Sequence, residues 1–228
     1  MTDLFQYLQE RPYPGRGILL GATPAGKSLI AYFIMGRSEN SRNRIFIEEK
    51  DGIRTEAHDP SKLVDPSLII YHPVRRFGDS MIVTNGDQTD TVRDYLSAGR
   101  DFHGALMTRE FEPDGPNWTP RISGLLRGDG SYTLSILKSA DGDPAVCQRF
   151  FYSYGAAAPG MAHFISTYAG FGSPIPSFSG EPVCVRTADW SAGEFLEKLW
   201  DSMDAANRIS LYVNVGGAIA MKNKNLGD

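Results

Sequence analysis

The feature that most constrains the fold is a short apolar run, Ser28–Met35, which reads S-L-I-A-Y-F-I-M. It is rich in β-branched and aromatic residues, it is shorter than a typical buried helix, and Gly36 follows it directly, so it predicts a buried strand. Apolar runs of similar length recur along the chain between turn residues. The other predicted strands are Gly17–Gly21, Ile45–Glu49, Ile53–Ala57, Ser67–Tyr71, Ser80–Thr84, Pro120–Leu126, Ser131–Leu137, Val146–Tyr152, Phe164–Tyr168 and Ile209–Val215.

Turn and helix signals organise these strands into an α+β chain. Asp51-Gly52 between two apolar runs is a hairpin signal. Helices are predicted within residues 85–99 and Phe102–Phe111, and Ser191-Ala192-Gly193-Glu194 is a capping box that opens a third. Residues 1–14 read as a short helix or arm. Hairpin runs with helices grouped in pairs predict antiparallel sheets, and the absence of repeats, linkers and charge blocks in 228 residues favours one domain over residues 1–228.

Composition excludes several classes of protein. The chain is 41% hydrophobic and 22% charged with a net charge of −4, which argues against nucleic acid or an anionic membrane as the main partner. No apolar run reaches membrane-spanning length. Cys147 and Cys184 are isolated, which indicates a reduced, cytoplasmic compartment. The four histidines lack zinc-like spacing to a cysteine or to another histidine, so no metal is expected.

One motif matches a nucleotide-binding pattern and is nevertheless rejected. Gly21-Ala22-Thr23-Pro24-Ala25-Gly26-Lys27-Ser28 fits the P-loop pattern G-x-x-x-x-G-K-S. A P-loop must open a helix whose amides hold the phosphates, whereas the residues after this motif read as a strand. No later strand ends in the aspartate that would complete a magnesium site. A hairpin turn with an exposed Lys27 is therefore the preferred interpretation, and a P-loop phosphotransferase the alternative.

The segment Tyr32–Arg44 ends in a cluster of arginines and small polar residues, with Arg37, Arg42 and Arg44 among serines and asparagines. The planar guanidinium group suits phosphate and carboxylate oxygens. Two interpretations remain open here. The loop is either a solvated turn whose arginines pair with nearby acids, or an anion site that recognises a phosphorylated small molecule.

Four segments together resemble the archaeal-type inosine monophosphate (IMP) cyclohydrolases and their bacterial relatives. They are the Tyr32–Arg44 loop, V-T-N-G-D-Q-T-D-T (residues 83–91), F-E-P-D (111–114) with T-P-R-I (119–122), and I-S-T-Y (165–168). In order and spacing the resemblance extends from about Arg16 to Ala220. It implies an N-terminal-nucleophile (Ntn) hydrolase-like fold, a four-layer αββα sandwich in which two packed antiparallel sheets are flanked by helices.

The resemblance also implies a reaction, the last step of de novo purine biosynthesis. In 5-formamidoimidazole-4-carboxamide ribonucleotide (FAICAR), the carboxamide nitrogen attacks the formyl carbon, the ring closes, water leaves and IMP forms. The implied reaction needs no metal and no cofactor. By motif, Arg44 would orient the carboxamide or stabilise the oxyanion, Tyr71 would transfer a proton near the formyl oxygen, and Glu112 would act as a base or orient its neighbours. The most specific motifs place Asn85, Thr89, Asp90 and Arg121 around the nucleotide, together with Asn43 of the arginine loop. Arg37 and Arg42 are expected to contact its phosphate or ribose on their charge alone.

Other interpretations stand beside this one. Arg44 could form a surface ion pair, Tyr71 could be a core tyrosine, and Glu112 could be a charge at a helix end. The chain departs from the archaeal pattern in a longer arginine loop, with Arg42 where proline is usual, and in a longer Gly170–Pro182 loop, expected to be a lid or a packed surface loop. A non-catalytic purine-ribonucleotide-binding protein and an amide hydrolase of the same fold are the alternative functions. A homo-oligomer is left open.

Overall fold

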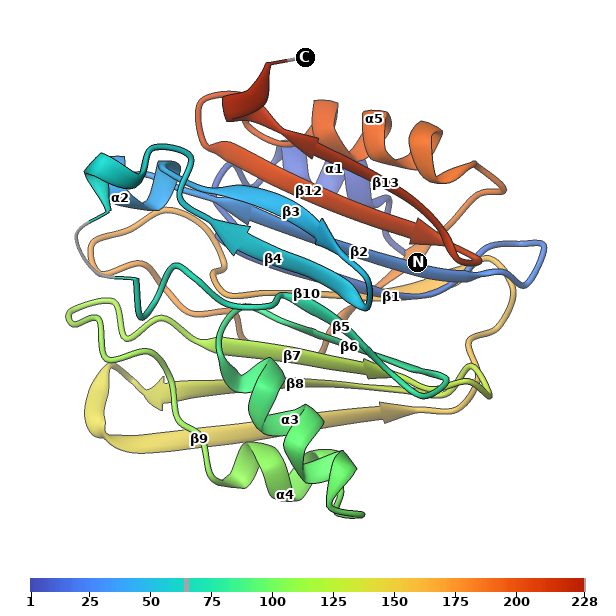
Figure 1. Ribbon diagram of the computed structural model, residues 1–228, viewed down its shortest axis with the longest axis horizontal. Helices are drawn as coiled ribbons and strands as arrows, with labels where there is room; N and C mark the ends of the chain where they lie inside the picture. The colour runs from blue at the N-terminus through green and yellow to red at the C-terminus, as the bar shows by residue number, and fades with distance from the viewer. Residues whose placement is uncertain (64–65, 228) are drawn as a thin grey trace.

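The computed structural model describes residues 1–63 and 66–227, and within them the chain forms two antiparallel sheets (Figure 1). The six-stranded sheet has the order β11-β10-β1-β2-β12-β13, and the seven-stranded sheet runs from β3 to β9 in chain order. The strands of the first sheet are β1 (Arg16–Ala22), β2 (Ser28–Met35), β10 (Met161–Ser166), β11 (Val183–Arg186), β12 (Arg208–Val215) and β13 (Ala218–Asn223). Those of the second are β3 (Ile45–Glu49), β4 (Gly52–Glu56), β5 (Val74–Phe77), β6 (Ser80–Thr84), β7 (Arg121–Leu126), β8 (Tyr132–Ala140) and β9 (Asp143–Tyr154).

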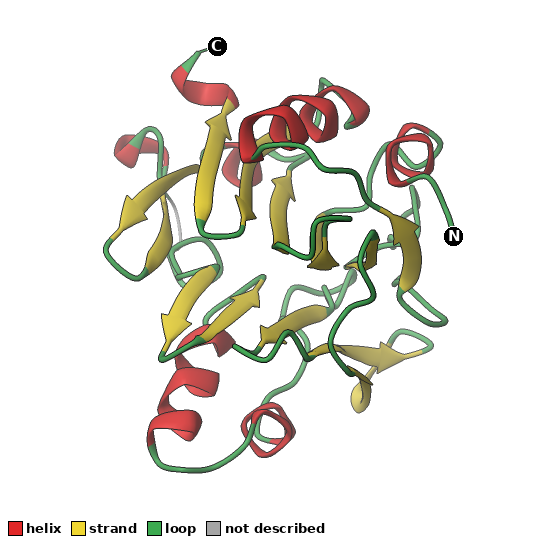
Figure 2. Cartoon of the chain, turned by 90° about the vertical axis from the view of Figure 1, so that its right-hand side faces the viewer, coloured by secondary structure: helices red, strands yellow, loops and turns green. Residues whose placement is uncertain are grey.

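Helices lie on the outer faces of both sheets. Helices α1 and α5 cover the six-stranded sheet, and α3 and α4 cover the seven-stranded sheet (Figures 1 and 2). The helices are α1 (Leu4–Gln9), α2 (Glu39–Arg42), α3 (Gln88–Ser97), α4 (Phe102–Met107) and α5 (Ala192–Ser202), with 3-10 turns η1 (Pro60–Lys62) and η2 (Lys224–Leu226). None of the helices in the described part of the chain is long and apolar enough to cross a membrane.

The alternation of side chains along β2 explains why the sheets stack. One face of β2 packs against the helices through Leu29, Ala31, Phe33 and Met35. The other face carries Ile30, Tyr32 and Ile34 into the core between the sheets. Successive side chains of a strand point to opposite faces, and both faces of β2 are apolar, so the strand must be covered on both sides. The predicted α+β class with two packed antiparallel sheets is confirmed.

The P-loop-like motif is the turn of a hairpin. β1 and β2 pair antiparallel from Arg16↔Ile34 to Ala22↔Ser28. The turn is closed by the Thr23 amide on the Lys27 carbonyl (2.9 Å) and the Gly26 amide on the Thr23 carbonyl (2.8 Å). A strand, not a helix, follows the motif, so its rejection as a P-loop is confirmed.

The predicted capping box opens α5 as expected. The Ser191 side chain accepts from the Glu194 amide, and the Glu194 side chain accepts from the Ser191 amide. The expected N-terminal arm is also ordered: Asp3 caps α1, whose Leu4 and Leu8 are buried against the sheet and α5.

Several sequence expectations were wrong in detail. The predicted strand Ser67–Tyr71 is a turn, because the amides of Ile69 and Ile70 both bond the Pro66 carbonyl (3.0 and 2.9 Å) and prolines bracket the segment. The second helix ends at Met107 rather than Phe111. The strand expected at Phe164–Tyr168 is Met161–Ser166. Elements not predicted at all are α2, β5, β11 and β13.

The long Gly170–Pro182 loop is packed rather than free. Ile175 and Phe178 are buried. The Ile175 amide donates to Asn117 Oδ1 (3.2 Å), and Lys138 Nζ donates to the Phe178 carbonyl (2.9 Å). Of the two expectations for this loop, the packed surface loop describes it.

Candidate functional site

Two buried arginines mark one end of the space between the sheets. Arg16 opens β1 and shares a strand face with Ile18 and Leu20, which pack between the sheets. Arg44 directly precedes β3 and has the same parity as Phe46 of that core. The exposed fraction is 9% for Arg16 and 1% for Arg44. Since side chains alternate along a strand, the Arg16 guanidinium is directed into the inter-sheet space. Arg44 Nε donates to the Ser41 carbonyl (2.9 Å), and its charge acts on Tyr32, whose side chain lies between the sheets.

Among the buried side chains, positive charge exceeds negative charge at this end. Among the described residues, the buried charged side chains are Arg16, Arg44, Glu112 and Arg121. Arg121 is balanced by Asp87, whose Oδ1 lies 2.8 Å from Arg121 Nη1. Arg16 and Arg44 therefore share one buried carboxyl, Glu112, and the other carboxyl that acts on this group, Asp114, is only half-buried. Charged side chains are rarely buried without a partner, so this imbalance suits an anionic or strongly polarised ligand.

The ionisation of these groups is strongly coupled. Burial, and to a smaller extent the charge of Asp114, raise the pKa of Glu112, and the nearby guanidinium groups of Arg16, Arg121 and Arg44 oppose that rise without cancelling it. Burial, and then the charge of Arg16, lower the pKa of Arg44. Burial also acts to lower the pKa of Arg16, but Glu112 and neighbouring tyrosine hydroxyls outweigh it, and that pKa is raised. Shifted ionisation of this kind is frequent at sites that transfer protons.

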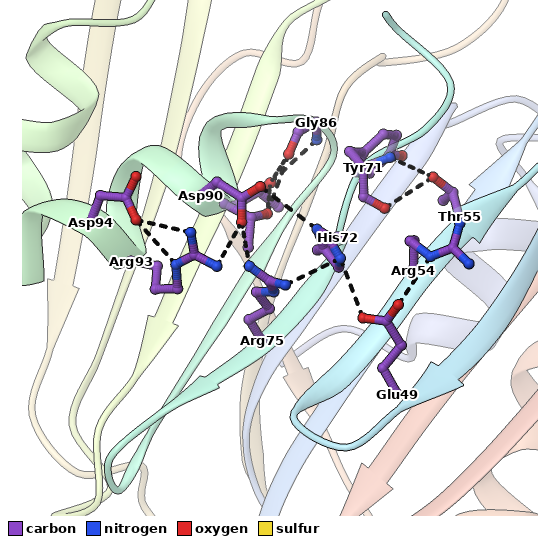
Figure 3. A network of polar contacts seen from close by, with 12 residues as sticks. Glu49, Arg54, Thr55, Tyr71, His72, Arg75, Gly86, Asp90, Arg93 and Asp94 are labelled. Carbon is purple, nitrogen blue, oxygen red and sulfur yellow. Dashed lines mark hydrogen bonds and ion pairs between the residues drawn. The ribbon is translucent and has the colours of Figure 1, made fainter. Parts of the chain in front are cut away.

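A pair of tyrosines completes the group. The hydroxyls of Tyr32 and Tyr71 are 2.9 Å apart, and both side chains are buried. Burial, and then the adjacent Tyr71, raise the pKa of Tyr32 well above its usual range. Thr55 fixes the Tyr71 backbone: Tyr71 N donates to Thr55 Oγ1 (2.9 Å), and Thr55 Oγ1 donates to the Tyr71 carbonyl (3.0 Å) (Figure 3). We call Arg16, Tyr32, Arg44, Tyr71 and Glu112 the buried polar cluster.

Asn85 connects the buried polar cluster to the start of α3. Its Nδ2 donates to the Pro120 carbonyl (2.9 Å) and to Glu112 Oε1 (3.4 Å). Its Oδ1 accepts from Ile122 N (2.8 Å) and from Gln88 Nε2 (3.0 Å). Each donor and acceptor of this buried amide is used, so its orientation is fixed and it holds the Glu112 side chain in turn.

Thr89 and Arg121 support the same turn from the helix side. Thr89 Oγ1 lies 2.6 Å from Thr84 Oγ1, in a buried contact. Arg121 Nη1 donates to Gln88 Oε1 (2.7 Å) in addition to its ion pair with Asp87. Both predicted residues are thus bonded to protein groups beside the buried polar cluster.

Asp90 lies in a separate ionic network over the outer side of the seven-stranded sheet (Figure 3). Its Oδ1 is 2.7 Å from Arg75 Nη1 and 3.5 Å from Arg93 Nη1. His72 lies between Asp90 (3.6 Å) and Glu49 (3.3 Å). Asp90 is half-exposed and joins β3, β5 and α3 through these contacts, rather than pointing into the buried polar cluster.

The other arginines of the loop serve different contacts. Arg37 is exposed, its guanidinium lies over the Tyr13 ring at 4.9 Å from the centroid, and its Nη1 donates to the Gly172 carbonyl at 3.4 Å. It therefore links the arginine loop to the Gly170–Pro182 loop.

Arg42 and Asn43 hold the loop to its surroundings. Arg42 Nε donates to the Gly36 carbonyl (3.0 Å), and its Nη2 donates to Asn207 Oδ1 (3.2 Å). Asn43 is buried, donates to the Asp59 carbonyl (2.8 Å) and accepts from the Asp59 amide (2.7 Å). The structure thus brings Arg44, Tyr71, Glu112 and Asn85 together, and directs the hydrogen bonds of Arg42 and Asn43 to neighbouring loops.

Sequence reasoning missed Arg16, Tyr32 and Tyr168. Tyr168 Oη is 2.6 Å from Thr119 Oγ1, and burial raises the Tyr168 pKa to about 12, although the charge of Arg16 acts against that rise. The available signal for Arg16 was a charged residue at the first position of a wholly apolar strand. For Tyr32 there was none, because a tyrosine within an apolar strand reads as core.

A cavity of about 530 Å³ lies at the opposite end of the β1–β2 hairpin from Arg16. Its lining includes Gly21 and Gly26 of the hairpin turn together with Arg76, Arg127 and Asn214. No group of three or more His, Cys, Asp or Glu side chains in residues 1–63 and 66–227 is arranged to hold a metal ion.

Comparison with known proteins gives a consistent result. The profile of the family described as IMP cyclohydrolase-like protein matches residues 13–218. The chain is 26% identical over 160 residues to an IMP cyclohydrolase of Methanococcus aeolicus, covering 68% of this chain and 74% of that protein. It is 31% identical over 124 residues to one of Methanococcus maripaludis (53% and 61% covered) and 31% identical over 122 residues to one of Methanopyrus kandleri (51% and 60% covered).

The family profile spans the sequence from before Arg16 to beyond β12, so it contains every residue of the buried polar cluster. The alignments to the Methanococcus maripaludis and Methanopyrus kandleri proteins cover about three fifths of those chains. The resemblance seen in the motifs is confirmed: the chain belongs to the IMP cyclohydrolase-like family.

Proposed function

We propose that this protein is an IMP cyclohydrolase, which closes the ring of FAICAR with loss of water to give IMP. The observation that carries the proposal is the buried polar cluster, where two guanidinium groups, a carboxyl of raised pKa and a tyrosine pair meet inside a chain of this family. Ring closure needs groups of this kind, because charge develops on the formyl oxygen while protons leave nitrogen.

The substrate supplies part of the catalysis. Its nucleophile and its electrophile belong to one molecule, so much of the entropic cost of bringing them together is already met. The enzyme has to select the reactive rotamer, stabilise the developing oxyanion and move protons. Arg44 orients the carboxamide or stabilises the oxygen that becomes negative. Tyr71 exchanges a proton near that oxygen, and Glu112, held by Asn85, accepts a proton from nitrogen or orients its neighbours.

The remaining assignments are also proposals. We place Arg37, Arg42, Asn43, Thr89, Asp90 and Arg121 around the nucleotide, either in contact with it or holding the loops that do. We group the fold with the Ntn hydrolase-like αββα sandwiches, as a single catalytic domain over residues 1–228. Unpaired Cys147 and Cys184 and a biosynthetic substrate fit a cytoplasmic enzyme.

The direct test is turnover of FAICAR by the purified protein without added metal, followed by the absorbance of IMP. We expect turnover by the wild type, and losses of at least about a hundredfold in kcat for Glu112→Gln and Tyr71→Phe, the usual scale of a lost proton-transfer group. Glu110→Gln is the matched control, because Glu110 is exposed and its ion pair to Arg149 is long at 3.8 Å.

Three outcomes contradict the proposal in different ways. No product above the uncatalysed rate excludes the cyclohydrolase and leaves a purine-ribonucleotide-binding protein. Formate release in place of IMP indicates an amide hydrolase. Equal turnover by wild type, Glu112→Gln and Tyr71→Phe rejects the residue roles while keeping the reaction.

A further inference from the structure

Arg16 is the least satisfied charged group in the buried polar cluster. Its Nε is buried and has no hydrogen-bond partner among the described residues. Its backbone is firmly held, since its amide donates to Thr167 Oγ1 (3.1 Å) and its carbonyl accepts from the Thr167 amide (2.9 Å). A buried donor without an acceptor costs free energy, so a fixed backbone that presents one suits an acceptor brought by a ligand.

The neighbours of Arg16 include the two residues to which we assign proton transfer. The side chains that act on its charge most strongly are Glu112, Tyr71, Tyr168 and Tyr13. Arg44 lies close enough for the two cations to repel each other. The guanidinium of Arg16 thus shares its surroundings with the three residues placed in the reaction by motif.

We propose that Arg16 is a further catalytic residue, the second cation of a two-arginine site that stabilises negative charge on the formyl oxygen during ring closure. This inference rests on the proposed cyclohydrolase activity. Arg44 alone would face the oxyanion from the β3 side; Arg16 supplies a donor from the other sheet.

Ring closure forms one carbon–nitrogen bond and releases one molecule of water. The lone pair of the carboxamide nitrogen forms the new bond to the formyl carbon, and the carbonyl π pair moves onto the formyl oxygen. The carboxamide nitrogen loses one proton and the formamido nitrogen loses its own. Both protons leave with the formyl oxygen as water, and the bond between the former formyl carbon and the formamido nitrogen becomes double. Arg16 donates hydrogen bonds to the oxygen when its charge is greatest, which is where a fixed donor is most effective.

A phosphate group is the other ligand that a buried arginine could bind. The position favours the reacting oxygen, because Glu112 and Tyr71 are the groups that act most strongly on the charge of Arg16, and phosphate recognition needs no titrating partner. The two ligands also make different kinetic predictions. A contact to the developing oxyanion affects kcat, whereas a phosphate contact affects substrate and product binding equally.

The experiment compares wild type, Arg16→Lys, Arg16→Met and Arg16→Ala by kcat, by Kd for IMP and by thermal unfolding. We expect Arg16→Met to lose about 10²- to 10³-fold in kcat, the scale for one donor of an oxyanion site, with Kd for IMP changed less than about fivefold. Arg16→Lys keeps part of the rate. Guanidinium chloride at millimolar concentration restores part of the Arg16→Ala rate.

The control is Arg11→Met, because Arg11 is a partly exposed arginine whose guanidinium lies over the Tyr7 ring. A wild type without turnover rejects the proposed function itself. Given an active wild type, an unchanged kcat in Arg16→Met overturns the inference. A Kd for IMP weakened by more than about tenfold with kcat retained also overturns it and assigns Arg16 to phosphate. If the Met and Ala variants fail to fold, an Arg16→Lys rate equal to wild type is the overturning result.

Discussion

Glu112 shows how one residue's surroundings set its chemistry. It is 2% exposed, its backbone amide bonds the Thr119 carbonyl (2.9 Å), and its carboxyl receives a long hydrogen bond from Asn85. Burial disfavours the charged carboxylate, while Arg16 and Arg44 favour it. Because the net effect raises the pKa, this carboxyl is a better proton acceptor than an exposed glutamate when it is ionised.

The pH dependence of the reaction should report this raised pKa. If Glu112 acts as a base, kcat/KM reaches its full value above the pKa of Glu112 and falls as the pH decreases through that pKa. The acid limb of the profile should therefore lie above pH 4.5, the ordinary glutamate value.

The free energy of unfolding should depend on pH in the opposite direction. A carboxyl whose pKa is raised in the folded state contributes stability below about pH 4.5, and this contribution is lost as the pH rises through the folded-state pKa. Glu112→Gln should therefore gain stability relative to wild type as the pH increases, measured by urea unfolding from pH 4 to 8. A constant difference across this range would contradict the assignment.

At the scale of elements, the β1–β2 hairpin places Arg16 and the P-loop-like turn at opposite ends, although they lie close together in the sequence. Arg16 and Ile34 lie at the end of the buried polar cluster, and the turn around Gly26 and Lys27 lies at the other end. The stem of Lys27 rests near Gly216, where a Cβ built on that glycine would be 3.3 Å from Lys27 Cβ and Cδ. The turn is thus packed at the far end of the hairpin, and its sequence match to a P-loop has no structural counterpart.

Lys27→Ala tests this separation. We expect no ATP binding by the wild type in calorimetry, FAICAR turnover by the variant within about twofold of wild type, and a stability change within about 0.5 kcal/mol, since Lys27 is exposed. ATP binding that Lys27→Ala abolishes would instead restore the P-loop interpretation.

The elements that sequence predicted best are those specified locally. The Asp51-Gly52 turn and the Ser191–Glu194 capping box lie where expected, because each is defined by a few adjacent residues. β5 and β13 were missed, because their sequences, V-R-R-F and A-I-A-M-K-N, become strands only through pairing with neighbours. The family motifs found Arg44, Tyr71 and Glu112, whereas the burial of Arg16 depends on the second sheet closing over it.

At the scale of the whole molecule, the sheets are joined by polar contacts as well as apolar packing. Tyr132 of β8 and His163 of β10 belong to different sheets, and Tyr132 Oη lies 2.6 Å from His163 Nδ1. The Tyr154 ring stacks on His163 with centroids 4.0 Å apart. This contact joins the sheets near the edges formed by β9 and β11.

His163 should make global stability depend on pH. Burial lowers its pKa below 6.5, so the unfolded chain takes up the proton first as the pH falls. The contribution of neutral His163 to the free energy of unfolding is fully present above about pH 6.5 and is lost as the pH falls below that value. We expect His163→Gln to flatten the fall of the unfolding free energy between pH 7 and 5, with exposed His58→Gln as the control. An unchanged slope in His163→Gln would contradict this account.

The strand order has a consequence for the order in which the protein is made. β2 lies between β1 and β12, and β12 begins at Arg208, long after β2 ends at Met35. During synthesis the hairpin emerges with one edge of its most apolar strand unpaired until nearly the whole chain has left the ribosome. An exposed apolar edge is a template for association between chains. The nascent protein is therefore expected to depend on chaperones in this interval, and truncation before β12 to yield aggregates rather than a smaller folded unit.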